Sequence, residues 1–220
     1  MGHKMLTIYE ELQLLSIHED KGIFIRSAAD ALVPGMSGAI LSDLALAGKI
    51  CTSDNHRLKL EESDPTNDSV LDDTIKVLKK SQKERKFGYW ISKINPKPEK
   101  LRRQVTKSLI SKGILTQEDD RLLWVIPSPL QPDGKGSSKY WLIEHLRGII
   151  LAQEDYQPHD VALLGLLNAC GLLDLVFLRD ERKLAIQAIN ERLVYQAMQD
   201  PNLETIQEID AAIASVVEED

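Results

Sequence analysis

The stretch Gly35-Met-Ser-Gly-Ala-Ile-Leu-Ser-Asp-Leu-Ala-Leu-Ala-Gly48 indicates the fold class of this chain. Apolar residues recur in it four positions apart, which places them on one face of a helix. These residues are Met36, Ile40 and Leu44. Gly48 stands where a left-handed residue ends a helix, so we expect a helix over residues 35–47. A hairpin should follow, because residues 49–52 and 57–60 flank a polar Ser-Asp-Asn turn.

The same order of elements recurs later in the chain. A helix is expected over residues 100–112, where Gly113 ends it, and a second hairpin is expected over residues 114–126. The glycine of each unit is preceded by a similar apolar stretch, Leu44-Ala-Leu-Ala-Gly48 and Leu109-Ile-Ser-Lys-Gly113. The two units form an internal repeat, and each resembles half of a winged helix-turn-helix.

Helical patterns account for most of the remaining sequence. The first begins at Thr7, whose spacing from Glu10 is that of a capping box, and runs to Ile17. A later one follows Pro158 and is apolar nearly all round, which predicts a buried core helix up to about Gly171. The other expected helices span residues 69–83, 138–153, 181–198 and 201–217. We therefore predict a mainly α fold with small β-hairpins.

Composition excludes several classes of protein. The chain has 220 residues, of which 43% are apolar and 28% charged, so it is neither disordered nor collagen-like. It contains no run of about 18 apolar residues, and we expect no bilayer-spanning helix. Acidic residues interrupt the first 20 positions, which argues against a signal peptide. Cys51 and Cys170 are isolated, so we expect a reduced, cytoplasmic protein without structural zinc.

The net charge of −7 is unevenly distributed along the sequence. Residues 76–112 carry thirteen basic and two acidic side chains, a net charge of +11. The remaining residues carry 14 basic and 32 acidic side chains, a net charge of −18. A concentrated basic segment in an acidic protein indicates a polyanionic partner at one face. The alternative is a solvated, lysine-rich surface.

No catalytic motif is present in the sequence. It lacks the spacings GxSxG, HExxH, the P-loop and GxGxxG, and its five histidines are scattered. The adjacent acid pairs at 72–73 and 119–120 are expected to cap helices or form turns, because neighbouring residues on a helix point apart. We therefore predict a protein that is not an enzyme and that holds no metal or cofactor.

Binding residues are easier to identify. Arg102 and Arg103 lie near the expected start of a helix, where backbone amides and two guanidinium groups together suit a phosphate. The alternative is a pair of surface arginines bound to Glu99 or another carboxylate. Trp90 and Tyr89 stand within the basic segment and suit either a membrane interface or the apolar face of a helix. For Trp90 we favour the core.

Several motifs, in the same order and spacing, resemble the Golgi phosphoprotein 3 (GPP34) family. They include Leu6-Thr-Ile-Tyr-Glu-Glu-Leu-Gln-Leu-Leu15, Gly35–Ile50, Val70-Leu-Asp-Asp73, Leu101–Thr116, the hairpin near Trp124–Leu130 and Asp160-Val-Ala-Leu-Leu-Gly-Leu-Leu167. The resemblance covers about residues 6–217. It implies a single helical domain over residues 1–220, with a core helix bundle, peripheral amphipathic helices and a projecting hairpin at about residues 122–142. This chain is similar to a short, prokaryotic type of member, because the long basic extension of eukaryotic members is missing.

The resemblance also implies a function. Eukaryotic members are peripheral membrane proteins that bind phosphatidylinositol 4-phosphate through a tryptophan and three basic residues. Arg102 matches one of two basic positions three apart, and Glu99 stands at the other. Ser37 stands where an arginine is expected, and the tryptophan position falls near Ala28.

Further residues complete the expected sites. Arg103 and Arg26 are candidates to supply the missing positive charge at the headgroup site. The apolar hairpin residues Val125, Ile126 and Leu130 are expected to enter the membrane interface or to join subunits, because the family's hairpin supports oligomerisation.

Three functions compete at this point. We favour a module that binds anionic phospholipid headgroups at a membrane surface. An adaptor that binds the tails of membrane proteins through its acidic surface is compatible with it. The alternative is a winged-helix-like nucleic-acid-binding protein, which is disfavoured because residues 35–47 carry no basic side chain.

Overall fold

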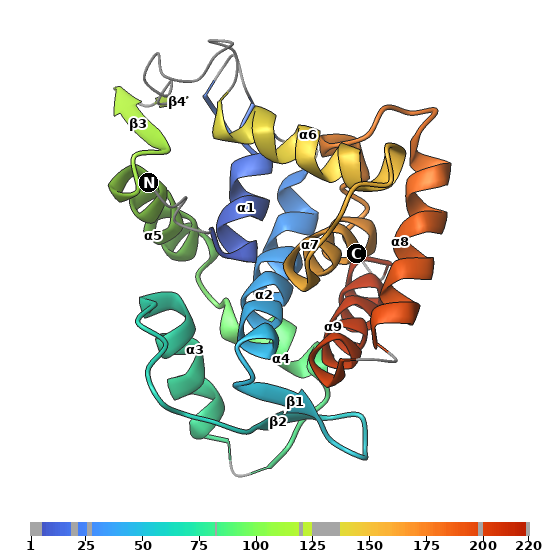
Figure 1. Ribbon diagram of the computed structural model, residues 1–220. Helices are drawn as coiled ribbons and strands as arrows, with labels where there is room; N and C mark the ends of the chain where they lie inside the picture. Colours follow the sequence, from blue (N-terminus) through green and yellow to red (C-terminus); the bar gives the residue numbers. More distant parts are fainter. Residues whose placement is uncertain are drawn as a thin grey trace.

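A central pair of helices organises the molecule. The computed structural model describes residues 6–18, 22–25, 28–81, 83–118, 121–124, 137–197 and 200–218. Helix α1 (Ile8–Leu15) lies against α2 (Ala29–Leu46) at the centre of the fold (Figure 1). Nearly the whole length of α2 from Pro34 to Ala45 is buried. The prediction of a mainly α fold is confirmed.

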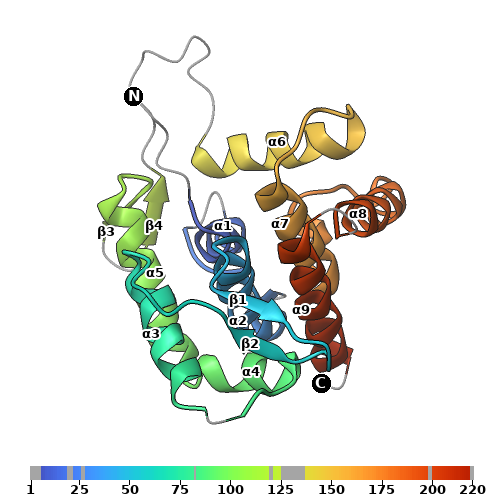
Figure 2. The same ribbon diagram turned by 60° about the horizontal axis from the view of Figure 1, so that its bottom comes forward.

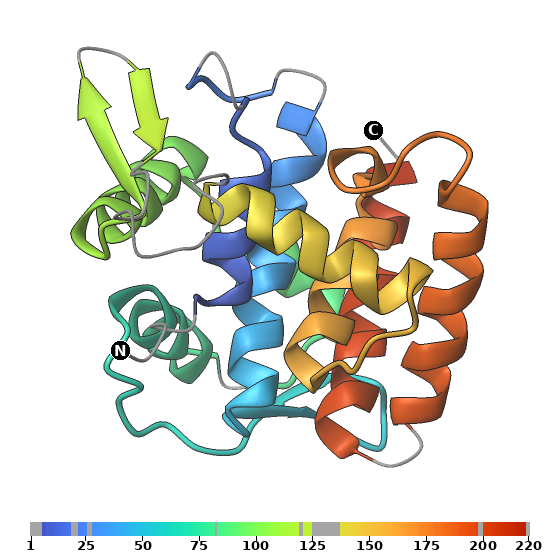
Figure 3. The same ribbon diagram turned by 45° about the horizontal axis from the view of Figure 1, so that its top comes forward.

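Two groups of helices flank this pair. On one side lie α7 (Pro158–Ala169), α8 (Arg182–Ala197) and α9 (Pro201–Glu218). On the other side lie α3 (Ser69–Lys79) and α5 (Pro98–Ser111), while α4 (Phe87–Ile94) packs against both α2 and α9. Helix α6 (Ser138–Leu151) crosses one end of the bundle (Figure 3).

Close helix contacts in the core depend on a glycine of α2. A Cβ atom at Gly38 would lie 2.1 Å from Cδ1 of Ile213 on α9 and 3.2 Å from Cδ1 of Leu166 on α7. Any larger residue would force at least the Ile213 side chain to move, because a closely packed interior has little space to absorb it.

Both expected helix–glycine–hairpin units are present. Gly48 and Gly113 adopt φ angles of +66° and +74°, the left-handed region that ends each helix. After the first unit's helix, β1 (Ile50–Thr52) pairs antiparallel with β2 (Leu58–Leu60). After the second, β3 (Leu115–Glu118) pairs antiparallel with β4 (Arg121–Trp124), and this hairpin extends beyond α5 (Figure 3).

The start of α1 is fixed as the sequence predicts. Thr7 accepts a hydrogen bond from the Glu10 amide, and the Glu10 carboxylate accepts one from the Thr7 amide. The Asp43 carboxylate of α2 also accepts bonds from the amides of Ile8 (3.0 Å) and Tyr9 (3.3 Å). Unpaired amides at the helix start are thereby satisfied, and α1 is tied to α2.

Some boundaries differ from those expected. Helix α2 begins six residues earlier than the apolar pattern indicates, at Ala29, and carries Pro34 within it. Proline removes one backbone donor, yet the helix continues through it, and the residues from Pro34 to Ala45 are buried in the bundle. The short strand expected near residues 22–26 is reduced to a single bridge between Ile17 and Phe24.

Among the described helices, α2 alone has the length and mean hydropathy (1.2) of a candidate membrane span. A core helix passes the same test, and 61% of α2 is buried inside the protein. Its contacts with α1, α7 and α9 are those of a core helix.

Candidate functional site

The basic segment gathers on one side of the fold. Residues 76–112 form the end of α3, the whole of α4 and α5, and the loops between them. Figure 2 shows α3 and α5 on the side of α1 and α2 away from α7 and α8, while α4 lies across the end of α2 and contacts α9. Most of the cations on them are exposed, whereas Arg102 and Lys112 are half-buried. The concentration of positive charge in the sequence is therefore also a concentration in space.

A pocket of about 140 Å³ lies within this region. It is formed where the start of α5 meets the first turns of α2, the end of α1 and the segment that leads into α2. We call it the Arg102 pocket; its lining is mainly apolar and includes Gln13, Ser16, Phe24, Ile25, Leu32, Val33, Met36, Asn95, Pro98, Glu99 and Arg102.

Arg102 is the cation of this pocket. Its guanidinium carbon lies 4.6 Å from the centre of the Phe24 ring, a cation–π contact that fixes the plane of the group. Nη2 forms an ion pair with the Glu99 carboxylate, one helical turn earlier on α5. The Arg102 side chain is still 43% exposed, so part of the fork of N–H donors faces solvent.

The backbone beneath Arg102 is held in place from α1. Gln13 Nε2 donates hydrogen bonds to the Arg102 carbonyl oxygen (3.1 Å) and to Thr106 Oγ1 (2.8 Å). Glu10, fully buried on the next turn of α1, accepts hydrogen bonds from Ser108 and Lys112 of α5. Although burial opposes its ionisation, these hydrogen bonds lower the pKa of Glu10. Helix α5 is thus anchored along one side while its first turn faces the pocket.

The other predicted headgroup residues lie outside this lining or outside the described residues. Ser37 is fully buried on α2, and its hydroxyl donates to the Val33 carbonyl oxygen (3.4 Å), whereas its neighbour Met36 lines the pocket. Arg103 is exposed on α5 beside Arg102 but does not line the pocket. Arg26 lies outside the described residues, and so do the hairpin residues Val125, Ile126 and Leu130.

One aromatic residue of the pocket is not among the residues predicted from the sequence. The resemblance places an aromatic ring near Ala28, and the structure instead supplies Phe24, four residues earlier. Trp90 is buried in the core as favoured, 3% exposed, and its ring meets the exposed Tyr89 ring edge-on. The aromatic ring that contacts Arg102 is therefore Phe24, and not Tyr89 or Trp90 of the basic segment.

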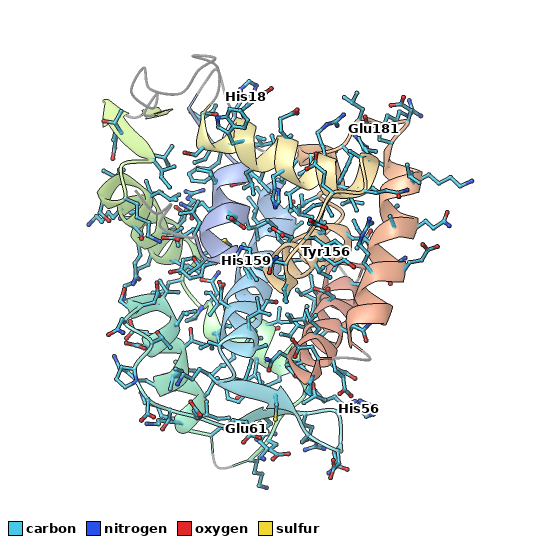
Figure 4. All side chains as sticks on the ribbon, in the orientation of Figure 1. His18, His56, Glu61, Tyr156, His159 and Glu181 are labelled. Carbon is cyan, nitrogen blue, oxygen red and sulfur yellow. The ribbon has the colours of Figure 1, made fainter. Side chains whose placement is uncertain are left out.

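Titratable groups elsewhere in the fold serve packing. His159 at the start of α7 faces α1, where its Nε2 lies 2.7 Å from the Glu11 carboxylate (Figure 4). Burial lowers the pKa of His159, but the hydrogen bond to Glu11 and the nearby carboxylates outweigh this and raise it. Burial raises the pKa of Cys170 strongly, which disfavours a reactive thiolate. In the part of the chain that the structure describes, no three His, Cys, Asp or Glu side chains converge as a metal site.

The helix of the first helix–glycine–hairpin unit is unsuited to reading a nucleic acid. A recognition helix presents an exposed polar face to a groove. Helix α2 instead buries residues 34–45, including Ser37, Ser42 and Asp43. The two units therefore share a local structure, but the helix of the first unit is part of the hydrophobic core.

A comparison with family models matches residues 8–212 to the model described as Golgi phosphoprotein 3 (GPP34). The match begins with α1 and ends within α9, and it includes every residue that lines the Arg102 pocket.

Proposed function

The chain belongs to the Golgi phosphoprotein 3 (GPP34) family, and on that premise we propose that it is a non-enzymatic, peripheral membrane protein that binds anionic phospholipid headgroups. The Arg102 pocket is the proposed headgroup site. The observation that carries the proposal is a half-exposed arginine, oriented by an aromatic ring, inside a concave site on the basic side of the fold.

Phosphate recognition at this pocket follows from the chemistry of Arg102. The planar guanidinium offers two parallel N–H donors to two phosphate oxygens, a geometry that lysine cannot supply. Glu99 occupies part of that fork in the free protein. A phosphate therefore competes with the Glu99 carboxylate for part of the fork, which lowers affinity.

The surrounding cations add attraction that does not depend on the headgroup. Each lysine or arginine near an anionic membrane surface contributes about 1 kcal/mol, an effect that falls off within a Debye length. The mainly apolar lining of the pocket and the exposed side chains of Ile23 and Val33 suit contact with the interface. These features support the proposal of a cytoplasmic protein that binds a membrane surface reversibly.

Headgroup selectivity is proposed to be broad. Glu99 and Ser37 stand at positions where the family resemblance implies basic residues, so only one of the expected cations surrounds the ligand. Phosphatidylinositol 4-phosphate is one ligand of this kind, and other anionic phospholipids should compete with it.

Two further properties belong to the same proposal. Self-association is proposed to use the hairpin, with Val125, Ile126 and Leu130 as contact residues. Deletion of residues 127–136 should then reduce the oligomeric mass measured by light scattering, and an unaltered mass would refute this role. An adaptor function is proposed to use the acidic surface outside residues 76–112 to attract basic protein tails.

Flotation with lipid vesicles tests the central proposal. Wild-type protein should float with phosphatidylcholine vesicles that contain phosphatidylinositol 4-phosphate or phosphatidylserine, and high salt should release it. Arg102→Ala should weaken binding roughly tenfold or more, because a charge-assisted hydrogen bond contributes about 1.5–3 kcal/mol. Lys107→Ala removes an exposed charge outside the pocket and is the matched control. Failure of the wild type to bind any anionic vesicle at low salt would refute the proposal.

A further inference from the structure

A second basic pocket lies on the opposite side of the first turn of α5. It has a volume of about 220 Å³ and opens between α3, the end of α4 and the start of α5. We call it the lysine pocket; its polar lining includes Lys93, Lys97, Lys100, Asn95, Gln104 and Asp73. Asn95 also lines the Arg102 pocket, so the two pockets share a rim.

The lysines of this pocket have no ion-pair partner in the part of the chain that the structure describes. Lys93, Lys97 and Lys100 are exposed, and none of them forms an ion pair or a side-chain hydrogen bond with the described residues. The acidic residue of the lining, Asp73, is bound to Lys76 outside the pocket (2.8 Å). Three cations therefore surround one concave site, in which the carboxylate of the lining, Asp73, is paired with Lys76 and not with them.

Two of the three lysines also stand where a helix tolerates them poorly, whereas Lys93 lies in the last turn of α4, where a cation is favourable. Lys97 is the N-cap of α5 and offers it no side-chain acceptor, and Lys100 follows in its first turn. Cations at the positive end of a helix are destabilising, and an anion there is stabilising. A bound anion would relieve this repulsion as well as the mutual repulsion of the three ammonium groups.

We propose that the lysine pocket binds the phosphate of a second anionic lipid, so that one molecule holds two headgroups at the same bilayer. This inference rests on the proposed function. The ligand is assigned as a lipid because the lysine pocket adjoins the Arg102 pocket at Asn95, within the same basic segment. The second headgroup then binds at a high effective concentration once the first is bound.

Two binding sites predict a steep dependence on membrane composition. Binding by the wild type should rise with about the second power of the anionic lipid fraction, whereas one site gives about the first power. The test uses phosphatidylcholine vesicles with increasing phosphatidylglycerol, which supplies a phosphate and no other charged group.

Charge-matched variants separate the site from general electrostatics. The pocket variant is Lys93→Gln, Lys97→Gln, Lys100→Gln, and the control is Lys80→Gln, Lys86→Gln, Lys107→Gln, whose exposed lysines lie in the same basic segment outside the lysine pocket. Both lose three positive charges. The pocket variant should bind at least about tenfold more weakly than the control, because it also loses charge-assisted hydrogen bonds to phosphate. It should also lose the steep dependence on phosphatidylglycerol.

The possible failures are distinguishable. If wild-type protein binds vesicles and the two triple variants behave alike, the second site is refuted and the proposed function stands. If wild-type protein binds no vesicle, both are refuted. A titration with inorganic phosphate, followed by amide resonances in NMR spectra, identifies the source of the ligand. Saturation of the lysine pocket by free phosphate without vesicle binding would mean that its ligand is a soluble anion, which also overturns the lipid assignment.

Discussion

The pairing of Glu99 with Arg102 yields the sharpest prediction. The substitution Glu99→Gln keeps the size and helical position of the side chain while removing the carboxylate that competes with a phosphate for Arg102. Both partners are substantially exposed, with 64% of the Glu99 side chain accessible, so their ion pair contributes at most about 1 kcal/mol. Loss of one negative charge near an anionic surface contributes about another 1 kcal/mol. Together the two effects should raise affinity for anionic vesicles by about fivefold to thirtyfold.

A matched variant isolates the effect of the pocket. Glu84 is an exposed acidic residue of the same basic segment that does not line the Arg102 pocket. Glu84→Gln changes the net charge equally but frees no guanidinium, so it should show only the general effect of charge. Flotation of both variants at several salt concentrations gives the ratio of their affinities, expected to be about two- to fivefold in favour of Glu99→Gln. Equal affinities, or weaker binding by Glu99→Gln, would refute the assignment of Arg102 as the phosphate ligand.

Two other substitutions test the core that supports the site. Asp210 of α9 is buried, its carboxyl oxygens lack hydrogen-bond partners among the described residues, and burial raises its pKa well above the usual range. Asp210→Leu should increase the free energy of unfolding by about 1–3 kcal/mol at pH 7. Because the folded-state pKa of this acid is raised, the contribution of Asp210 to stability should fall as pH rises above the unfolded value of about 4. The difference in stability between the variant and the wild type should therefore grow with pH in urea unfolding. A variant less stable than the wild type at pH 8 would contradict this reasoning. Gln13→Leu removes the hydrogen bonds to Arg102 and Thr106, and it should cost about 1–2 kcal/mol in urea unfolding and also weaken vesicle binding. Unchanged stability and binding would show that this link does not position α5.

Local sequence signals predict most of the helices because their physical causes are local. The capping box of Thr7 and Glu10 and the glycines that end α2 and α5 act within a few residues, and the structure contains all of them. The early start of α2 is exposed or half-buried and lines the Arg102 pocket with Ala29, Leu32 and Val33, whereas only the later residues of α2 are buried in the bundle. Tertiary packing of this kind has no signature in a short window of sequence.

The site is only partly predictable for the same reason. Charge density and helix position point equally to Arg102 and Arg103, and the packed structure places only Arg102 in the pocket lining. Phe24 becomes its neighbour only because α1, α2 and α5 pack together, and no spacing in the sequence links the two residues. Helical geometry also explains why Met36 and not Ser37 lines the pocket, since successive residues point about 100° apart.

The anchoring of α5 to α1 by Gln13 and Glu10 affects the rate at which the protein would bind its ligand. A binding site whose residues are already in position needs little rearrangement when the ligand arrives. Its association rate is therefore limited by diffusion and orientation. For the proposed phosphate ligand, residence time would then depend on the partly exposed Arg102 side chain. Such a protein would bind and dissociate from membranes rapidly, and it would stay bound longer only where the fraction of anionic lipid is high.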